Sequence, residues 1–154
     1  MPGRIDARLK ELGIELPAAS KPTFSFVPCV RTGQTLFVSG QVTMWNGERR
    51  HVGKLGREIS IEEGQKAARL CALNVLAQAK EFLGDLDQVT RVVMVQGFVN
   101  ATPEFTDHPK VVNGASDLFV ELYGEAGKHA RFAIGAGSLP FNVAVEVAAV
   151  LEVR

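Results

Sequence analysis

The stretch that decides the fold is His129–Val153, which reads HARFAIGAGSLPFNVAVEVAAVLEV. It predicts two strands, the first carrying Arg131 and the second, Val143–Leu151, carrying Glu146. In the second strand, odd-numbered residues fall on one face and even-numbered residues, Glu146 among them, on the other. Both faces are apolar around Glu146, which indicates a strand covered on both sides.

A carboxylate inside such a strand loses its water, at a cost of roughly several kcal/mol unless a partner or a polar cavity meets it. Arg131 is the nearest strand-borne cation upstream and is one candidate partner. The two residues therefore predict either a structural ion pair that braces the sheet or the polar part of a site. Their spacing leaves both readings open.

The composition describes an ordinary globular protein. A chain of 154 residues suits one domain, 1–154, and its 46% hydrophobic and 22% charged residues are typical of such a domain. Lys+Arg 17 balances Asp+Glu 17, so no net field attracts nucleic acid or an anionic membrane. Cys29 and Cys71 lack a metal or redox spacing, which favours free thiols in a reducing compartment over a disulfide. With no signal peptide or membrane span in evidence, we expect a cytoplasmic protein.

The first half of the chain predicts a helix, a connector and a hairpin. Residues 1–22 hold a short helix, Arg4–Leu12, and a connector that follows Gly13. The apolar runs Phe24–Val30 and Thr35–Gln41 flank a tight turn and predict two paired strands.

The second half alternates helices and strands. A capping box at Ser60 opens a long helix that ends at Leu83, ahead of Gly84. A strand at Thr90–Asn100 and a second helix from His108 to Gly124 follow. The stripes that we expect to be buried are Ile61, Ala68, Cys71, Val75, Ala79 and Phe82 in the first helix and Val112, Ala115, Phe119 and Leu122 in the second.

The resulting order, β-β-α-β-α-β-β, predicts an α+β domain in which two long helices cover one face of a mixed sheet. The strands at Val92–Val99 and Val143–Leu151 are nevertheless apolar on both faces. The uncovered face needs another cover, and a copy of the same subunit is the simplest one. We therefore expect an oligomer whose sheets face each other.

The residue pattern argues against several chemistries. His51, His108 and His129 are scattered and lack the spacing of a metal site. Ser39 lies in S-G-Q rather than in a nucleophile elbow, and no phosphate-binding glycine motif is present. We therefore expect neither a metal nor a cofactor.

What remains is a guanidinium and an embedded carboxylate. Arg131 offers a planar fork that grips a carboxylate with two hydrogen bonds. A glutamate in a partly dry pocket, as expected for Glu146, has a raised proton affinity and can orient or deprotonate water. Together they suit cofactor-free hydrolysis of a small carboxylic acid. Asn113, within the second helix, offers a further hydrogen bond or else faces solvent.

Four motifs carry a family resemblance: F-V-S-G-Q at 37–41, V-V-N at 111–113, H-A-R-F-A-I-G at 129–135 and L-P-F-N-V-A-V-E-V at 139–147. In order and spacing they resemble the RidA (YjgF-type) family across about Phe24–Val153. The leader R-L-K-E-L-G-I-E-L-P is similar to that of a longer subgroup, often called endoribonuclease L-PSP-like.

The resemblance implies a chorismate-mutase-like two-layer sandwich, a homotrimer with clefts between subunits, and a deaminase. Its reaction would be hydrolysis of 2-imino or enamine acids to 2-keto acids and ammonia. Arg131 would hold the substrate carboxylate and Glu146 would activate water. The remaining substrate-binding positions that the family motifs imply are Phe26, Ser39, Gly40 and Asn113.

The chain also departs from the family pattern. Phe26 replaces a tyrosine, Ala148 replaces a second glutamate, Phe132 replaces a serine, and the segment Asn100–Lys110 is longer than its counterpart. These departures support an alternative, a non-catalytic trimer that binds small carboxylates or partner proteins. A ribonuclease is the least favoured reading, because the net charge is zero and no histidine pair is present.

Overall fold

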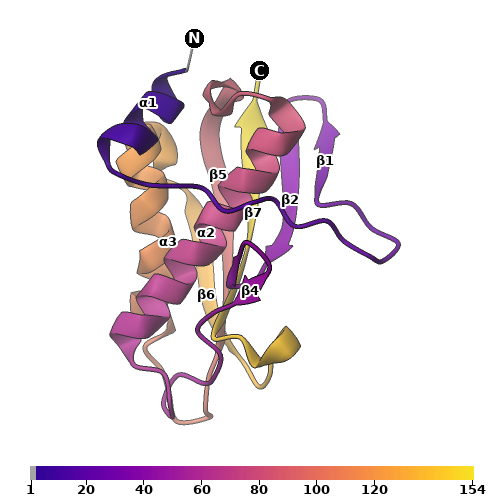
Figure 1. The fold of residues 1–154 in the computed structure, drawn as a ribbon. Coiled ribbons are helices and arrows are strands. Elements are labelled where there is room, and N and C mark those ends of the chain that lie inside the picture. The colour runs from indigo at the N-terminus through magenta and orange to yellow at the C-terminus, as the bar shows by residue number, and fades with distance from the viewer. Residues whose placement is uncertain (1–2) are drawn as a thin grey trace.

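A computed structural model describes residues 3–154 and arranges them in two layers, helices over a sheet (Figure 1). The expected order of strands and long helices is confirmed, with a small extra hairpin, β3–β4, between β2 and α2. The helices are α1 (Arg4–Glu11), α2 (Ile61–Leu83) and α3 (His108–Tyr123), and the strands are β1 (Cys29–Thr32), β2 (Thr35–Gln41), β3 (Met44–Trp45), β4 (Glu48–Arg49), β5 (Val89–Asn100), β6 (Ala130–Ala136) and β7 (Val145–Val153). Three 3-10 turns, η1 (Leu86–Gln88), η2 (Gly124–Gly127) and η3 (Pro140–Asn142), complete the described part.

The main sheet is mixed, as the sequence predicted. Within residues 3–154 it has five strands in the order β1-β2-β7-β5-β6. Only β5 and β6 run parallel in it, joined by α3, while its other described pairs are antiparallel. Strand β7 is therefore central, and β1 and β6 are the two edges. The residues that we expected to form a site come from β2, β7 and β6, from α3 (Asn113) and from the loop before β1 (Phe26).

The two faces of the sheet have different surroundings. Helices α2 and α3 pack on the face that carries Val145, Val147 and the other odd-numbered residues of β7, all of them buried. The opposite face carries the even-numbered residues of β7, which are half-buried except for exposed Glu152, and apolar side chains of its neighbours. We call it the outer face; across it, Phe37 pairs with Val150, and Glu146 with Phe98. The alternation in the sequence was read correctly, but one chain covers the strand on only one side.

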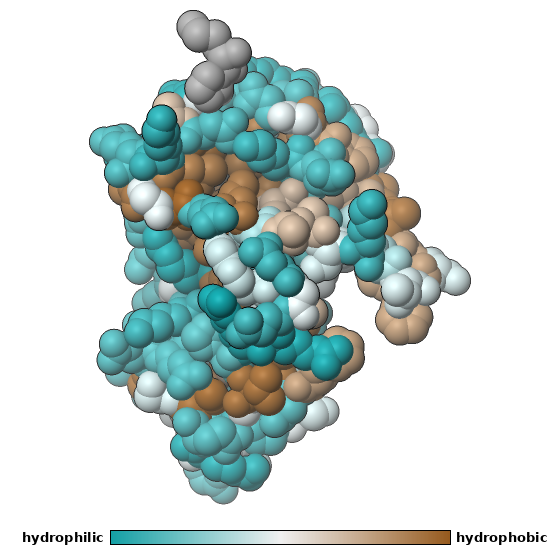
Figure 2. Space-filling view, viewed as in Figure 1, coloured by the Kyte–Doolittle hydropathy of each residue, from teal (hydrophilic) through white to brown (hydrophobic). Residues whose placement is uncertain are grey.

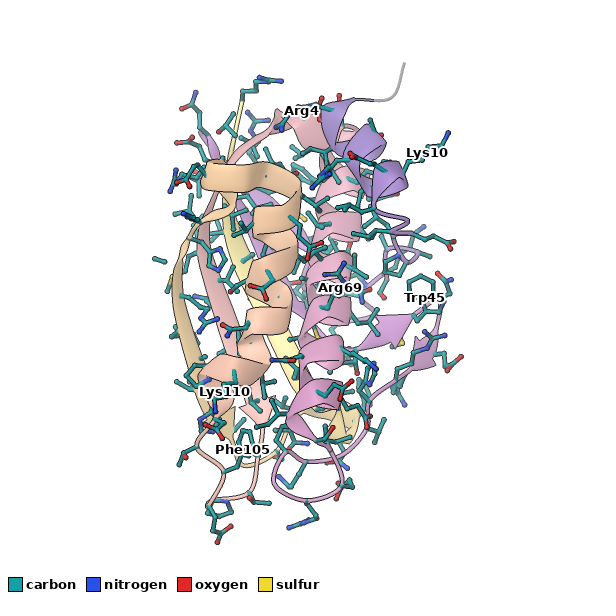
Figure 3. All side chains as sticks on the ribbon, turned by 90° about the vertical axis from the view of Figure 1, so that its left-hand side faces the viewer. Arg4, Lys10, Trp45, Arg69, Phe105 and Lys110 are labelled. Carbon is teal, nitrogen blue, oxygen red and sulfur yellow. The ribbon has the colours of Figure 1, made fainter. Side chains whose placement is uncertain are left out.

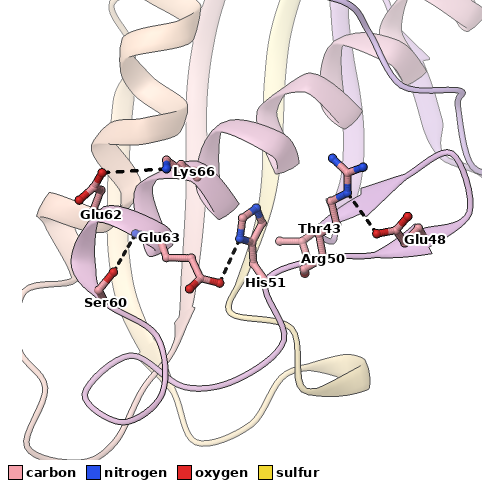
Figure 4. Close-up of polar contacts among 8 residues, drawn as sticks. All are labelled: Thr43, Glu48, Arg50, His51, Ser60, Glu62, Glu63 and Lys66. Carbon is pink, nitrogen blue, oxygen red and sulfur yellow. Dashed lines mark hydrogen bonds and ion pairs between the residues drawn. The ribbon is translucent and has the colours of Figure 1, made fainter.

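Helix α2 has the ends that the sequence predicted. Ser60 Oγ accepts a hydrogen bond from the backbone N–H of Glu63 at 3.1 Å (Figure 4), and Gly84 closes the helix at a φ of 84°. One expected member of its buried stripe is wrong, because Phe82 is exposed. Leu83, four residues after Ala79 on the same side of the helix, packs against the core instead.

The first predicted strand is shorter than the run Phe24–Val30. Strand β1 begins at Cys29, and Phe24, Phe26 and Val27 lie exposed in the loop ahead of it. Pro28 explains the boundary, because a proline has no N–H to donate to a sheet. Its carbonyl still accepts a hydrogen bond from the N–H of Ser39 at 2.9 Å, so the β ladder starts beside it.

The N-terminal segment docks on the helical layer. The backbone N–H groups of Arg4 and Ile5 donate to the Asp87 carboxylate at 2.7 and 2.8 Å, and Ile5 is fully buried. The connector then crosses α2, where buried Gln78 donates to the Ser20 carbonyl at 2.7 Å. Within residues 3–154, no helix combines the length and apolar character needed to cross a membrane.

The helical layer is held together mainly by apolar packing. Figure 3 shows α2 and α3 side by side, with Arg69 on α2 and Lys110 on α3. Arg69 Nη1 also forms an ion pair with Glu121 of α3 at 3.3 Å. All four residues expected on the inner face of α3 are buried, so that prediction is confirmed. The thiols of Cys29 and Cys71 are both free and buried, as the sequence favoured.

Candidate functional site

The expected site residues fall into two groups on different parts of the sheet. Arg131 lies on edge strand β6 in register with Val95, whose side chain points under the helices. Glu146 lies on β7 in register with Phe98, on the outer face. The two charged side chains thus occupy opposite faces, and no ion pair joins them in the described chain. The structural Arg131–Glu146 bridge that the sequence left open is therefore wrong within one chain.

Arg131 is held by neutral groups of α3. Its Nη1 donates to Asn113 Oδ1 at 2.8 Å and to Ser116 Oγ at 3.2 Å, and its Nη2 donates to the Pro109 carbonyl at 3.4 Å. No carboxylate of residues 3–154 lies within ion-pair distance of the guanidinium. A half-buried arginine with only neutral partners keeps its full charge available for an anion.

Asn113 has a definite partner rather than facing solvent unused. It lies in the second turn of α3, where its Oδ1 accepts the bond from Arg131. Its Nδ2 group has no partner among the described residues, so two N–H donors remain beside the guanidinium. The groups of Arg131 and Asn113 that remain free are thus all hydrogen-bond donors.

Glu146 is isolated on the outer face. Burial raises the pKa of its carboxyl group above the ordinary value, and no cation of residues 3–154 pairs with it. Gly40 of β2 makes room for it, because a Cβ atom at position 40 would lie 2.1 Å from Glu146 Oε2. Within one chain, the space above Gly40 is therefore occupied by the Glu146 carboxylate.

Phe26, Ser39 and Gly40 share one small cavity, of about 130 Å³, beneath the loop that precedes β1. Figure 2 shows the surface hollowed under this projecting loop. Lys21 is the one charged residue among the cavity's described lining residues, and Glu146 is not among them. Three of the expected substrate-binding residues thus lie together, beside Gln78 of α2 and away from Arg131, which is on the opposite edge strand β6.

A second cavity was missed by sequence reasoning. It has a volume of about 420 Å³ and lies beside the long segment 100–110, lined by Lys54, Arg57 and His108 among others. Lys54 Nζ donates to Asn100 Oδ1 at 2.7 Å and to the Gly137 carbonyl, so its charge is already in contact with two acceptors. No expected site residue lines this cavity.

Two residues beside Arg131 were also missed. Ser116 Oγ lies 2.8 Å from His129 Nε2, and His129 Nδ1 lies 2.6 Å from the Gly127 carbonyl oxygen. The signals were present in the sequence, because His129 is two residues before Arg131 and Ser116 is three from Asn113 on a helix. Nothing in the sequence showed that this helix and this strand would meet. Within residues 3–154, no group of three or more metal-ligating side chains occurs.

Comparison with known proteins decides the family. The sequence model of the family described as “YjgF/chorismate mutase-like, putative endoribonuclease” matches residues 6–153. The chain belongs to this family. The YjgF relationship also accounts for the mixed sheet with two helices on one face, and the fold expected from the motifs is confirmed.

Individual YjgF-type relatives are similar over their whole length. Protein TCP17 of Trypanosoma cruzi is 48% identical over 153 residues, which cover 99% of this chain and 96% of that protein. The crystal structure of Atu1372 from Agrobacterium tumefaciens, a protein of unknown function, is 45% identical with a TM-score of 0.91, covering 98% and 93% of the two chains. A Shewanella oneidensis structure that carries the same endoribonuclease description is 33% identical with a TM-score of 0.93, covering 97% and 99%.

Proposed function

We propose that the protein hydrolyses 2-imino or enamine acids to 2-keto acids and ammonia, in clefts between the subunits of a homotrimer. The observation that carries the proposal is the Arg131 guanidinium, half-buried and hydrogen-bonded to neutral acceptors alone within residues 3–154. Membership of the YjgF/RidA-like family supports it. The hydrolysis proposed here would need no metal or cofactor.

The free edge of Arg131 suits a carboxylate. Three of the five N–H groups of the guanidinium donate to Asn113, Ser116 and Pro109. The donors that remain are Nε–H and one Nη2–H. When Pro109 takes the Nη2 hydrogen that faces Nη1, these two donors lie on the same edge of the planar group. Two parallel N–H groups match the two oxygens of a substrate carboxylate. The imino acid would therefore be gripped at C1, with C2 directed away from β6.

Glu146 supplies the base in this proposal. A carboxyl group whose pKa is raised by burial is a stronger base than an exposed one. It would take a proton from a water molecule as the water oxygen attacks C2 of the C2=N bond. The nitrogen gains that proton, which gives a tetrahedral carbinolamine. The hydroxyl proton of this intermediate would then pass to the nitrogen through Glu146, so the carbon–nitrogen bond breaks and ammonia leaves as the C2=O bond forms. An enamine would first take a proton at C3 to become the imine.

A second subunit is needed to complete this site. Arg131 is at the β6 edge on the helix-covered face, whereas Glu146 lies on the outer face near β2. Head-to-tail contacts that repeat around a three-fold axis bring one edge of a subunit against a different surface of the next. In such a ring, Arg131 and Asn113 of one copy would face Ser39, Gly40, Phe26 and Glu146 of another.

The activity is tested with an imino acid generated in situ by an amino acid oxidase. The protein should accelerate the appearance of the keto acid above the uncatalysed rate, and Arg131→Ala should abolish the gain. Arg91→Ala is the matched control, because Arg91 contacts the Lys128 carbonyl on the surface and lies outside both groups. A wild-type rate equal to the uncatalysed rate would refute the proposal.

A non-catalytic carboxylate-binding trimer is the second candidate. Phe26 favours it, because its exposed ring offers no hydroxyl group at the cavity that Ser39 and Gly40 line. This alternative predicts saturable binding of a keto acid, weakened by Arg131→Ala, without turnover. The endoribonuclease description of the family is tested separately, by asking whether any RNA cleavage survives both Arg131→Ala and further purification.

A further inference from the structure

Beside Arg131, a chain of hydrogen bonds runs from a backbone carbonyl to the guanidinium. The carbonyl of Gly127 lies 2.6 Å from His129 Nδ1, His129 Nε2 lies 2.8 Å from Ser116 Oγ, and Arg131 Nη1 lies 3.2 Å from the same Oγ. All three links involve side chains, those of Ser116 on α3, Arg131 on β6 and His129 just before β6. None of these contacts is explained by packing of the core alone.

Each hydrogen in this chain can be assigned. A carbonyl only accepts, so His129 Nδ1 carries a proton and donates it to Gly127. Burial, together with the charge of Arg131, lowers the pKa of His129, while the bond to Gly127 raises it. The neutral ring leaves Nε2 as an acceptor, and the Ser116 hydroxyl donates to it. The lone pairs of Ser116 Oγ then accept from Arg131.

We propose that His129 and Ser116 are positioning residues that hold Arg131 in the orientation needed to bind the carboxylate of a substrate. The inference rests on the proposed function, because it assigns a purpose to the fixed guanidinium. Ser116 and Asn113 together take both N–H groups of Nη1. The guanidinium therefore cannot rotate about its last bonds without breaking a hydrogen bond, and its Nε edge stays open.

The His129 end of this hydrogen-bond network is itself rigid. The ring of Phe119 meets that of His129 edge to face, with centroids 6.0 Å apart, and Phe119 is fully buried. Gly127 lies so close to α3 that a Cβ atom there would stand 2.3 Å from the Phe119 carbonyl oxygen. Only glycine places the accepting carbonyl at this point. The imidazole is thus fixed by packing on one side and by a hydrogen bond on the other.

The hydrogen bonds that run from Gly127 through His129 and Ser116 to Arg131 form a relay. This relay also limits which ligand fits Arg131. Ser116 and a neutral His129 contribute no charge, so Arg131 supplies one positive charge on a fixed plane. A planar monocarboxylate satisfies one guanidinium edge with two hydrogen bonds. The relay thereby sharpens the substrate class to acids whose single carboxylate is free to lie in the plane of the Arg131 guanidinium.

The first test measures binding of 2-oxobutanoate by calorimetry in the full-length protein. Ser116→Ala should raise Kd about tenfold, the effect of losing one hydrogen bond to a charged group. Ser116→Thr, which keeps the hydroxyl, should restore binding, and His129→Phe should weaken it. Asp117→Ala is the control, since Asp117 is an exposed neighbour on α3. In turnover, Ser116→Ala should raise KM and leave kcat nearly unchanged.

The second test does not depend on a ligand. Long-range proton–nitrogen NMR correlations near pH 7 should show His129 as the neutral Nδ1–H tautomer, and Ser116→Ala should shift its Nε2 resonance. The Nε2–H tautomer, a charged ring, or wild-type binding by both Ser116→Ala and His129→Phe would overturn the relay. Absence of any 2-oxobutanoate binding would refute the proposed function instead, and the NMR result would still decide the relay.

Discussion

The two halves of the candidate site are built in opposite ways. Around Arg131, one chain supplies three hydrogen-bond acceptors: Asn113, Ser116 and Pro109 hold the guanidinium, and His129 contacts the serine. Around Glu146, the described chain provides space through Gly40 but no partner. Under the proposed function, the half that would bind the carboxylate is therefore preorganised within a subunit. The half with a raised proton affinity depends on what covers the outer face.

The largest effect is expected from placing a charged side chain on the outer face. Phe37→Glu places a carboxylate on the outer face, where Phe37 is 47% exposed, and should dissociate the proposed oligomer and abolish turnover. Phe82→Glu is a matched control, because Phe82 is 49% exposed but lies on α2. Light scattering at micromolar concentration checks both variants. If the wild-type protein is already monomeric, no second subunit covers the outer face. The proposed dependence of the Glu146 half on such a cover would then be wrong.

A smaller effect is expected from Gly40→Ala. The added methyl group would collide with Glu146 Oε2, the mobile end of a side chain, so the fold should survive while the carboxylate moves. We expect kcat to fall roughly tenfold, less than the ~10²–10⁴-fold that a positioned general base supplies, because the carboxylate is displaced and not removed; the affinity for 2-oxobutanoate should be unchanged. Gly137→Ala is the control, since nothing lies within 4 Å of a Cβ at position 137. If Gly40→Ala still slows the reaction in a Glu146→Gln background, the effect does not run through Glu146.

The smallest effect concerns stability and pH. Burial raises the pKa of Glu146 in the folded state above its ordinary value of 4.5. Between the ordinary pKa and the raised pKa of the folded state, the folded protein binds more protons than the unfolded chain. The free energy of unfolding therefore falls as pH rises through this window. Glu146→Gln removes that penalty and should raise Tm slightly at neutral pH, with no gain below about pH 4.

The measurement is a thermal melt at fixed protein concentration across this pH range. Glu104→Gln, an exposed carboxylate in the long segment before α3, controls for the loss of a surface charge. An equal gain at acid and neutral pH would mean that packing, rather than ionisation, sets the effect at Glu146.

The sequence predicted best what depends on local signals. Helix α2 was correctly bounded because Ser60 and Gly84 mark its ends, and β7 was correctly oriented because strand alternation is a strict period. Strand β1 was overextended because the apolar run Phe24–Val27 resembles a strand, while the proline after it prevents one. Residues close in sequence thus supplied both the successes and this error.

Contacts between elements were harder to predict. Arg131 and Glu146 are near in sequence, but β5 separates their strands in the sheet. Their registers with Val95 and Phe98 place them on opposite faces. The partners of Arg131 come from α3, and no local pattern pairs Ser116 with His129. Periodicity assigns a residue to a face of its own element, but it does not say which element packs against that face.

The path from β5 through α3 to β6 has a consequence for evolution. Arg131, its acceptors on α3, the histidine and the glycine behind them all lie within residues 89–136, one uninterrupted parallel crossover. That segment can be inherited, or exchanged between relatives, as a unit without disturbing its internal geometry. Under the proposed function, a change in the strand that bears Glu146 would alter the reaction in this lineage and leave the contacts of Arg131 in place.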